Sequence, residues 1–353
     1  MSLTTLSANG FLGRLSGFDA IIDARSEDEF ALDHLPGAVN WPTLNNEERR
    51  VIGTLYVQVN PFEARKRGAA IAARNIATHI ERELMDKPKD WRPLTYCWRG
   101  GQRSGALSLI LAQIGFRVTL LEGGYKAFRA AVVADIPQRV SRLNWRVVCG
   151  TTGSGKTRLL QALAANGAQV LDLEALANHR SSVLGAVEGL AQPTQKRFDN
   201  LIWQALRQFD PARPVFIESE SKKVGNVALP PALVDAMHGS PCLNLVLSDS
   251  QRVALLMEDY DFFVRNIESF CERLQVLSTF LGKTLVAQWQ ASVRAGEIEP
   301  VVQDLLRHHY DPGYLQSIRR NFRNFEGARI LEPADRSPGA MTALAQQLIE
   351  ETP

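Results

Sequence analysis

The chain has 353 residues, 45% of them hydrophobic and 22% charged, and a formal net charge of +2. This composition supplies cores for two domains, and the sequence has neither a long apolar span nor a signal peptide, so we expect a soluble cytoplasmic protein without a membrane contact. The small net charge excludes nucleic-acid binding through overall charge, and any RNA contact must come from local patches.

The first third of the chain alternates short apolar strands with helical patterns, which predicts an α/β domain over residues 1–133. One helix is expected to begin at Asn60-Pro61, where Glu63 would complete a capping box. Residues 134–143, which include a proline, are predicted to be a linker.

A cysteine loop follows the apolar strand 94–96 and precedes a helix predicted over 104–114. The loop consists of Cys97, Trp98, Arg99, Gly100, Gly101, Gln102, Arg103 and Ser104. Inward N–H groups, the helix dipole and the two arginines should stabilise the Cys97 thiolate, which is the reactive form. The alternative is a buried structural cysteine, but such a residue is not normally followed by so polar a loop. We predict that Cys97 and Arg103 are catalytic and that the other loop residues bind an anion.

Three segments around this loop resemble a rhodanese domain. They are residues 21–30, 34–42 and 121–128, which read IIDARSEDEF, HLPGAVNWP and LEGGYKAF. The resemblance covers about the first 130 residues and places Cys97 where rhodaneses carry the cysteine that forms a persulfide.

The spacing Cys-x5-Arg-Ser is also that of cysteine-dependent phosphatases, in which N–H groups and the arginine hold phosphate oxygens while the thiolate attacks phosphorus. A phosphatase also needs an acid to protonate its leaving group, and no such residue is evident near the loop. A substrate that is itself a phosphate analogue carrying a chalcogen would reconcile both patterns.

A second anion loop fits the G-x-x-x-x-G-K-[ST] pattern of a phosphate-binding loop at every fixed position. It consists of Gly150, Thr151, Thr152, Gly153, Ser154, Gly155, Lys156 and Thr157. The apolar run 145–149 predicts a strand before it, and the periodicity of 157–166 predicts a helix after it. The loop suits a diphosphate, with Lys156 at the outer phosphate and Thr157 able to bind Mg²⁺.

The carboxylates that follow differ from those of an ordinary ATPase, because neither Asp172 nor Glu218 ends a four-residue apolar run. Residues 218–223 collect carboxylates, hydroxyls and ammonium groups at one strand end, where ligands bind in open α/β sheets. A solvated turn is the alternative. The candidate site in the second domain comprises His179, Arg180, Glu218, Glu220, Lys222 and Lys223.

The second domain is predicted over residues 144–353, with a parallel sheet followed by a mostly helical part from residue 250. Arginines beside aromatic residues could bind RNA phosphates there, although a solvated helix face is an equal alternative. The candidates are Arg307, Arg319, Arg320 and Arg323. The four cysteines show no zinc-site spacing, and the pair His308-His309 lacks a third ligand, so no metal site is predicted.

The whole chain resembles the tRNA 2-selenouridine synthases, which fuse a rhodanese domain to a P-loop domain. Besides the two loops, the similar segments are residues 178–182, 192–196, 218–225 and 309–312, which read NHRSS, QPTQK, ESESKKVG and HYDP. The resemblance implies replacement of sulfur by selenium in wobble 2-thiouridine of tRNA, through S-geranylation by geranyl diphosphate and then selenation by selenophosphate. It implies no tightly bound cofactor. Cys97 would carry selenium as a perselenide, and an enzyme that supplies selenophosphate is a candidate partner.

Two other function classes fit parts of the sequence. A sulfurtransferase or cysteine phosphatase coupled to an ATP-using P-loop domain would hydrolyse ATP. A non-catalytic adaptor would tolerate Cys97→Ser.

Overall fold

The computed structural model describes residues 2–180, 189–259 and 266–351. Ser181 and Ser182, which belong to one of the segments in the family resemblance, lie outside these ranges. Within them, no helix is both long and apolar enough to cross a membrane.

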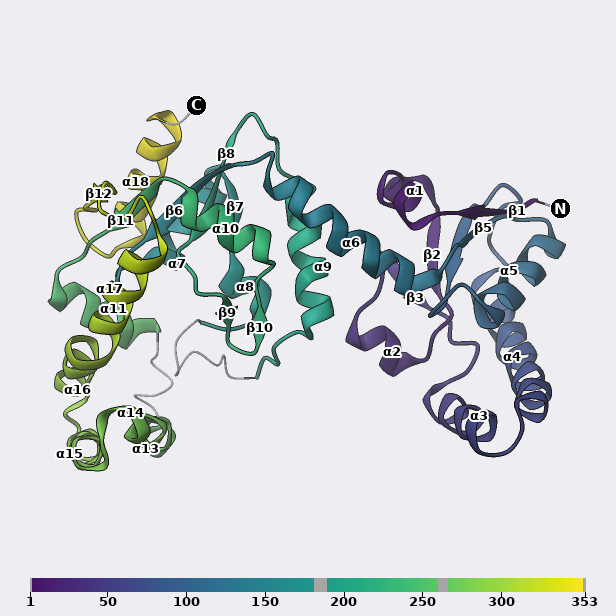
Figure 1. The fold of residues 1–353 in the computed structure, drawn as a ribbon, viewed down its shortest axis with the longest axis horizontal. Coiled ribbons are helices and arrows are strands. Elements are labelled where there is room, and N and C mark those ends of the chain that lie inside the picture. Colours follow the sequence, from purple (N-terminus) through teal and green to yellow (C-terminus); the bar gives the residue numbers. More distant parts are fainter. Residues whose placement is uncertain (1, 181–188, 260–265, 352–353) are drawn as a thin grey trace. The chain divides into compact units, whose positions relative to one another are not determined.

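The chain forms two compact units, each built around a five-stranded parallel sheet with helices beside it (Figure 1). The first unit comprises Met1–Ile136 and Pro193–Gln204, and the second comprises Pro137–Gln192 and Ala205–Pro353. The predicted α/β class is confirmed in both.

The sheet of the first unit has the strand order β1-β5-β4-β2-β3. Its strands are β1 (Ser2–Leu6), β2 (Ala20–Asp23), β3 (Ala38–Asn40), β4 (Pro93–Tyr96) and β5 (Arg117–Leu121). The central strand β4 is buried along its whole length and pairs with β2 and β5. Parallel strands end at one edge of the sheet, and Cys97 follows β4 directly at that edge.

The helices of the first unit are α1 (Ala8–Leu12), η1 (Leu15–Gly17), α2 (Glu27–Leu32), α3 (Asn46–Gln58), α4 (Pro61–Glu83), α5 (Gln102–Ile114), most of α6 (Gly124–Val140) and most of α9 (Gln195–Leu206). The start of α4 is confirmed, because the Asn60 side chain accepts hydrogen bonds from the N–H groups of Phe62 and Glu63. In the predicted capping box, the Glu63 carboxylate would accept a hydrogen bond from the Asn60 N–H. It instead forms an ion pair with Lys66, three residues further along the helix.

Helix α6 continues through most of the segment predicted as a linker. Phe128, Val132, Ile136 and Val140 are buried at every fourth position, so one apolar stripe crosses Pro137 without interruption. A proline inside a helix removes one backbone hydrogen bond. The burial of the stripe offsets this loss, which is why the proline does not end the helix.

The sheet of the second unit has the strand order β12-β11-β6-β8-β7. Its strands are β6 (Asn144–Cys149), β7 (Gln169–Leu171), β8 (Pro214–Glu218), β11 (Cys242–Leu245) and β12 (Arg329–Leu331), and β9 (Lys223–Val224) and β10 (Val227–Ala228) form a separate hairpin. Val148 of β6 pairs with Glu218 of β8. The phosphate loop and Glu218 therefore lie side by side at the carboxyl edge.

The helices of the second unit include α7 (Lys156–Ala165), α8 (Leu173–Ala177), α10 (Pro231–Gly239), α11 (Asp249–Asp259), α13 (Ile267–Val276), α14 (Ser278–Leu281), α15 (Lys283–Arg294), α16 (Ile298–Leu305), the π-helix η2 (Leu306–Tyr310), α17 (Asp311–Asn321) and α18 (Pro338–Glu351). The helical C-terminal part is thus confirmed, with an apolar cluster of its own that includes Phe270 and Trp289. The three-residue edge strand β12, which follows it, was too short to predict.

Two candidate active sites

The first candidate site is the turn that joins β4 to α5. Cys97 is buried, and its Sγ accepts a hydrogen bond from Ser104 Oγ at 3.1 Å. Among the described residues, the N–H groups of residues 98–101 have no hydrogen-bond acceptor. The positive end of the α5 dipole lies at the same turn, since α5 begins at Gln102. The predicted nucleophile therefore lies beside free N–H donors that suit an anion.

A second turn packs against the cysteine loop. The N–H groups of Tyr125 and Lys126 donate to the carbonyl oxygens of Cys97 and Trp98 at 2.8 and 3.0 Å. Gly124 has a φ of 57°, and a Cβ there would overlap the Cys97 carbonyl and come within 2.5 Å of the Gly100 nitrogen. Only glycine fits both the conformation and the close approach.

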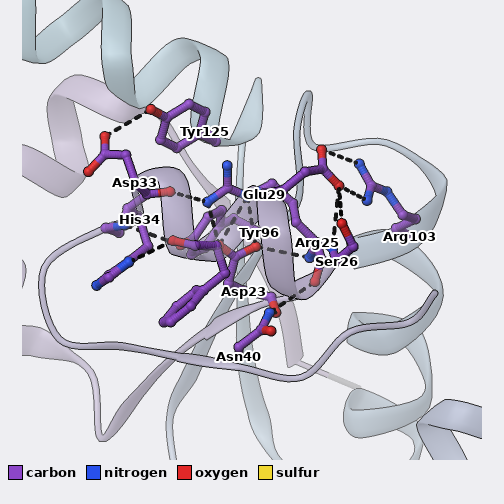
Figure 2. Close-up of polar contacts among 12 residues, drawn as sticks. Asp23, Arg25, Ser26, Glu29, Asp33, His34, Asn40, Tyr96, Arg103 and Tyr125 are labelled. Atoms are coloured by element: carbon purple, nitrogen blue, oxygen red, sulfur yellow. Dashed lines mark hydrogen bonds and ion pairs between the residues drawn. The ribbon is translucent and has the colours of Figure 1, made fainter. Parts of the chain in front are cut away.

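Arg103, predicted to be a catalytic residue that also holds the anionic donor, forms an ion pair with Glu29 (Figure 2), with 2.7 Å between Nη1 and Oε2. The Glu29 carboxylate also accepts a hydrogen bond from the Ser26 N–H, within the capping box of α2. Burial favours the neutral form of Glu29, but Arg103, the Ser26 N–H and Arg49 outweigh it and hold the pKa below its usual value. Arg103 is therefore shared with a carboxylate, and its part in donor binding stays a prediction.

A buried polar network at the same sheet edge was not predicted (Figure 2). Arg25 is 1% exposed, binds the Asp23 carboxylate and donates to the Asp33 carbonyl at 2.7 Å. Tyr96 donates to the Asp23 carboxylate at 2.7 Å, and Tyr125 donates to the Asp33 carboxylate at 2.8 Å. Burial, reinforced by these carboxylates, raises the pKa of both tyrosines, so they stay neutral donors. The network fixes the strand ends around the cysteine loop.

The second candidate site is the phosphate loop after β6. Gly150, Gly153 and Gly155 have φ values of 149°, 78° and 90°, which favour glycine. Lys156 Nζ donates to the Gly150 carbonyl at 2.6 Å, so the lysine spans its own loop. The hydroxyl of Tyr314 accepts from the Gly150 N–H at 2.8 Å.

Two side chains that hold this loop were missed. Arg252 is 5% exposed, donates to the Thr152 carbonyl at 2.8 Å and pairs with Asp311. Tyr314 places its ring 5.6 Å from Lys156 Nζ. The sequence held only an indirect signal for Arg252, because its partner Asp311 lies in the segment HYDP.

Glu218 is buried beside the phosphate loop. Its Oε1 accepts bonds from two backbone N–H groups at the start of α8, at 2.7 and 2.9 Å, while Oε2 has no partner within the described ranges. Burial, and then the charges of Asp172 and Glu220, raise the pKa of Glu218 well above its usual value. Thr157, which donates to Glu174 at 3.2 Å, offers a second oxygen nearby. An orphaned carboxylate oxygen and a loop hydroxyl fit Mg²⁺ bound with a diphosphate.

A cavity of about 930 Å³ in the second unit joins these groups. Much of its wall comes from the phosphate loop and from residues 218–223. Another part of the wall is apolar or aromatic and comprises Leu255, Leu256, Tyr310, Tyr314, Ile318 and Phe322. Of the predicted second-domain site, Arg180, Glu218, Glu220, Lys222 and Lys223 line the cavity, whereas His179 does not.

The four arginines predicted to contact RNA do not share one environment. Arg320 lines the cavity, Arg307 lies 3.7 Å from Asp249, and Arg319 lies 3.2 Å from Glu326. Arg323 is exposed. Arg307 and Arg319 form surface ion pairs, which explain their charges without RNA. Contact of any of the four arginines with RNA stays a prediction.

Two family models match the chain in the order of the two units. The rhodanese-like domain matches residues 7–131, and the tRNA 2-selenouridine synthase AAA domain matches residues 143–275. The fold and both loops thus define a protein that joins a rhodanese-like domain to a P-loop domain.

Curated relatives narrow this class. A tRNA 2-selenouridine synthase of Nitrosomonas eutropha is 32% identical over 88% of this chain and 91% of its own length. That of Cupriavidus necator is 31% identical over 92% of this chain and 93% of its own. That of Nitrosomonas europaea is 35% identical, and the match spans 68% of this chain and 63% of that relative. This chain belongs to the tRNA 2-selenouridine synthase family.

Proposed function

We propose that this protein replaces sulfur by selenium in wobble 2-thiouridine of tRNA. In the first step geranyl diphosphate alkylates the sulfur, and in the second step selenophosphate supplies selenium. The relatives' shared name supports the overall exchange. The observation that carries the geranylation step is the cavity, because a phosphate loop and an apolar wall bound the same space, as a prenyl diphosphate requires.

Geranylation is assigned to this cavity. The thiouridine sulfur forms a bond to C1 of the geranyl group, the C–O bond to diphosphate breaks, and diphosphate leaves with the electron pair. Lys156 and the loop N–H groups would stabilise the charge that develops on diphosphate. Mg²⁺, held by Thr157 and Glu218, would supply further positive charge at the same phosphates. The residues Leu255 and Phe322 would cover the isoprenoid chain.

Selenation is assigned to the cysteine loop. An S-geranyl group turns the thiocarbonyl into a thioether, so C2 becomes open to a selenium nucleophile and geranyl thiolate can leave. The free N–H groups of residues 98–101 suit the tetrahedral oxyanion of selenophosphate. Ser104, which donates to Cys97 Sγ, stabilises the thiolate that acts on this donor.

The test is a reconstitution with thiolated anticodon RNA, geranyl diphosphate and selenophosphate in the absence of ATP. Mass spectrometry of the nucleosides should show S-geranyl-2-thiouridine first and 2-selenouridine later. Hydrolysis of added ATP in step with product would favour the kinase-like alternative. Unchanged selenouridine in cells that lack the protein would contradict the proposed function.

The mass of Cys97 after brief exposure to selenophosphate distinguishes two routes. Attack of the thiolate on selenium adds selenium to the sulfur and expels phosphorus as phosphite. Attack on phosphorus adds a phosphoryl group and releases selenide. Both routes require the Cys97 thiolate. If Cys97 stays unmodified in an active protein, its role is not covalent.

A further inference from the structure

Helix α9 belongs by its position in the sequence to the P-loop domain, yet its first ten residues complete the first unit. The family model of the AAA domain spans residues 143–275, whereas Pro193–Gln204 cluster with the rhodanese-like fold. The segment QPTQK at its start is part of the family resemblance, and the two assigned steps give it no role.

Polar contacts anchor this helix along its length. Asn200 donates to the carboxylate of Asp33 at 2.9 Å and to the carbonyl of His34 at 2.8 Å. Asp199 forms an ion pair with Arg129. Trp203, fully buried, donates to Asp135 at 2.8 Å. Thr194 Oγ1 donates to the Leu32 carbonyl at 2.7 Å, which fixes the start of the helix.

These anchors place Lys196 at the cysteine loop. Its Nζ lies 5.2 Å from the centre of the Trp98 ring, and Trp98 follows Cys97 directly. The Trp98 ring is itself 5.5 Å from that of Tyr125, whose hydroxyl binds Asp33. The same buried carboxylate thus orients both the aromatic ring and the helix that carries the lysine.

The charge of Lys196 is not explained by the stability of α9. The first turn of the helix contains Lys196 and Arg197 and no acidic residue, although anions are favoured there by the helix dipole. Arg197 lies 3.8 Å from Asp33, whereas Lys196 has no carboxylate within ion-pair distance in the part of the chain that the structure describes. The Lys196 ammonium group therefore lies beside the cysteine loop, in which the N–H groups of residues 98–101 have no acceptor among the described residues.

We propose that Lys196 is a donor-binding residue of the Cys97 site, which holds the oxyanion of a phosphate-type chalcogen donor. The role assigned to Lys196 rests on the proposed function, in which this donor is selenophosphate. The lysine comes from a segment embedded in the P-loop domain sequence, so the anion site of the rhodanese-like unit is incomplete without it.

The test compares four full-length proteins: wild type, Lys196→Ala, Lys196→Met and Lys196→Arg. Lys66→Ala is a matched control, because Lys66 also stands over an aromatic ring, at 5.1 Å from Phe62 on α4. Pre-geranylated RNA and varied selenophosphate isolate the selenation step. We expect the KM for selenophosphate to rise about five- to tenfold in the Ala and Met variants, the range for a partly solvated charged contact. The kcat at saturation, the geranylation rate and the values for Lys66→Ala should not change.

Arginine should restore most of the affinity because it keeps the charge, and added salt should narrow the gap between wild type and Lys196→Met. Unchanged donor KM in Lys196→Met would overturn the role of Lys196. So would a weaker RNA affinity with an unchanged donor KM, since the lysine would then serve an RNA phosphate. Thermal melting confirms that each exposed substitution leaves the fold intact.

Donor binding to Cys97→Ser, which cannot react, separates this result from the proposed function. Anaerobic calorimetry with selenophosphate, and with thiophosphate as a stable analogue, should show binding that Lys196→Met weakens. No binding when Lys196 is present would contradict the donor assignment itself. Equal binding with and without Lys196 would contradict only the lysine's role.

Discussion

The two anion loops of this protein are held in opposite ways. The cysteine loop is fixed by backbone contacts from the turn at Gly124, and the N–H groups of its residues 98–101 have no acceptor among the described residues. The phosphate loop is held by side chains, with Lys156 on the Gly150 carbonyl and Tyr314 on the Gly150 N–H. The first loop is thus ready for a small anion, whereas a diphosphate must displace internal bonds of the second. This difference agrees with two separable steps.

Removal of the proposed nucleophile, Cys97, should give the largest effect and tests whether the loops are separable. Cys97→Ala takes one small side chain from a loop whose shape is set by backbone bonds, so the fold should persist. Selenouridine formation should fall to background, while geranylated RNA accumulates. Nucleoside mass spectrometry measures both, and normal selenium incorporation would place the chemistry elsewhere.

The reciprocal change is Lys156→Ala, which removes the cation that we propose stabilises the departing diphosphate. Geranylation should slow by about a hundredfold or more, as when a transition-state donor is lost. Chemically geranylated RNA should restore selenation in this variant and not in Cys97→Ala. Equal loss of both steps in both variants would show a single merged site.

The backbone support of the cysteine loop can be broken without touching its side chains. Gly124→Ala would force a Cβ onto the Cys97 carbonyl at a positive φ, and we expect a loss of about 1 to 3 kcal/mol in the free energy of unfolding. Selenation should fall and geranylation should stay normal. Gly105→Ala is the control, because Gly105 lies within α5 and a Cβ there meets nothing within 4 Å. Similar losses in both variants would contradict the close-packing account.

The smallest effect should come from Arg103→Ala, which sharpens the comparison by asking what the arginine holds. Loss of the bond to Glu29 should cost about 1 kcal/mol of unfolding free energy at neutral pH. The pKa of Glu29 is lowered in the fold, so its contribution is present above the ordinary value of 4.5 and disappears as pH falls through the folded pKa. Denaturant unfolding of both proteins should therefore converge in acid.

Arg103 has a second predicted role, in binding the donor. A rise in donor KM for Arg103→Ala that persists in a Glu29→Gln background would support direct binding. A rise that vanishes there would mean that Arg103 acts only through Glu29.

Sequence alone determined the class of this protein, because both loops are contiguous and their residues lie in the order strand, loop, helix. Both loops can be recognised without any distant partner, from Gly150, Gly153, Gly155 and Lys156 in one and from Cys97 and its arginines in the other. The strand β12 and the continuation of α6 through Pro137 were not predicted, but both are local features that leave the α/β architecture of the two units unchanged.

What surrounds each loop was decided by the tertiary structure. Tyr314 and Arg252 reach the phosphate loop from positions about 160 and 100 residues away along the chain, and Asn200 reaches Asp33 across 167. Such contacts leave no local pattern, since any exposed helix can carry a tyrosine, an arginine or an asparagine. The same holds for Lys196, whose residue type is ordinary and whose position over Trp98 exists only because α9 packs on the first unit. Local chemistry can be read from neighbouring residues, but the groups that orient and complete it are brought together by packing, which depends on the whole chain.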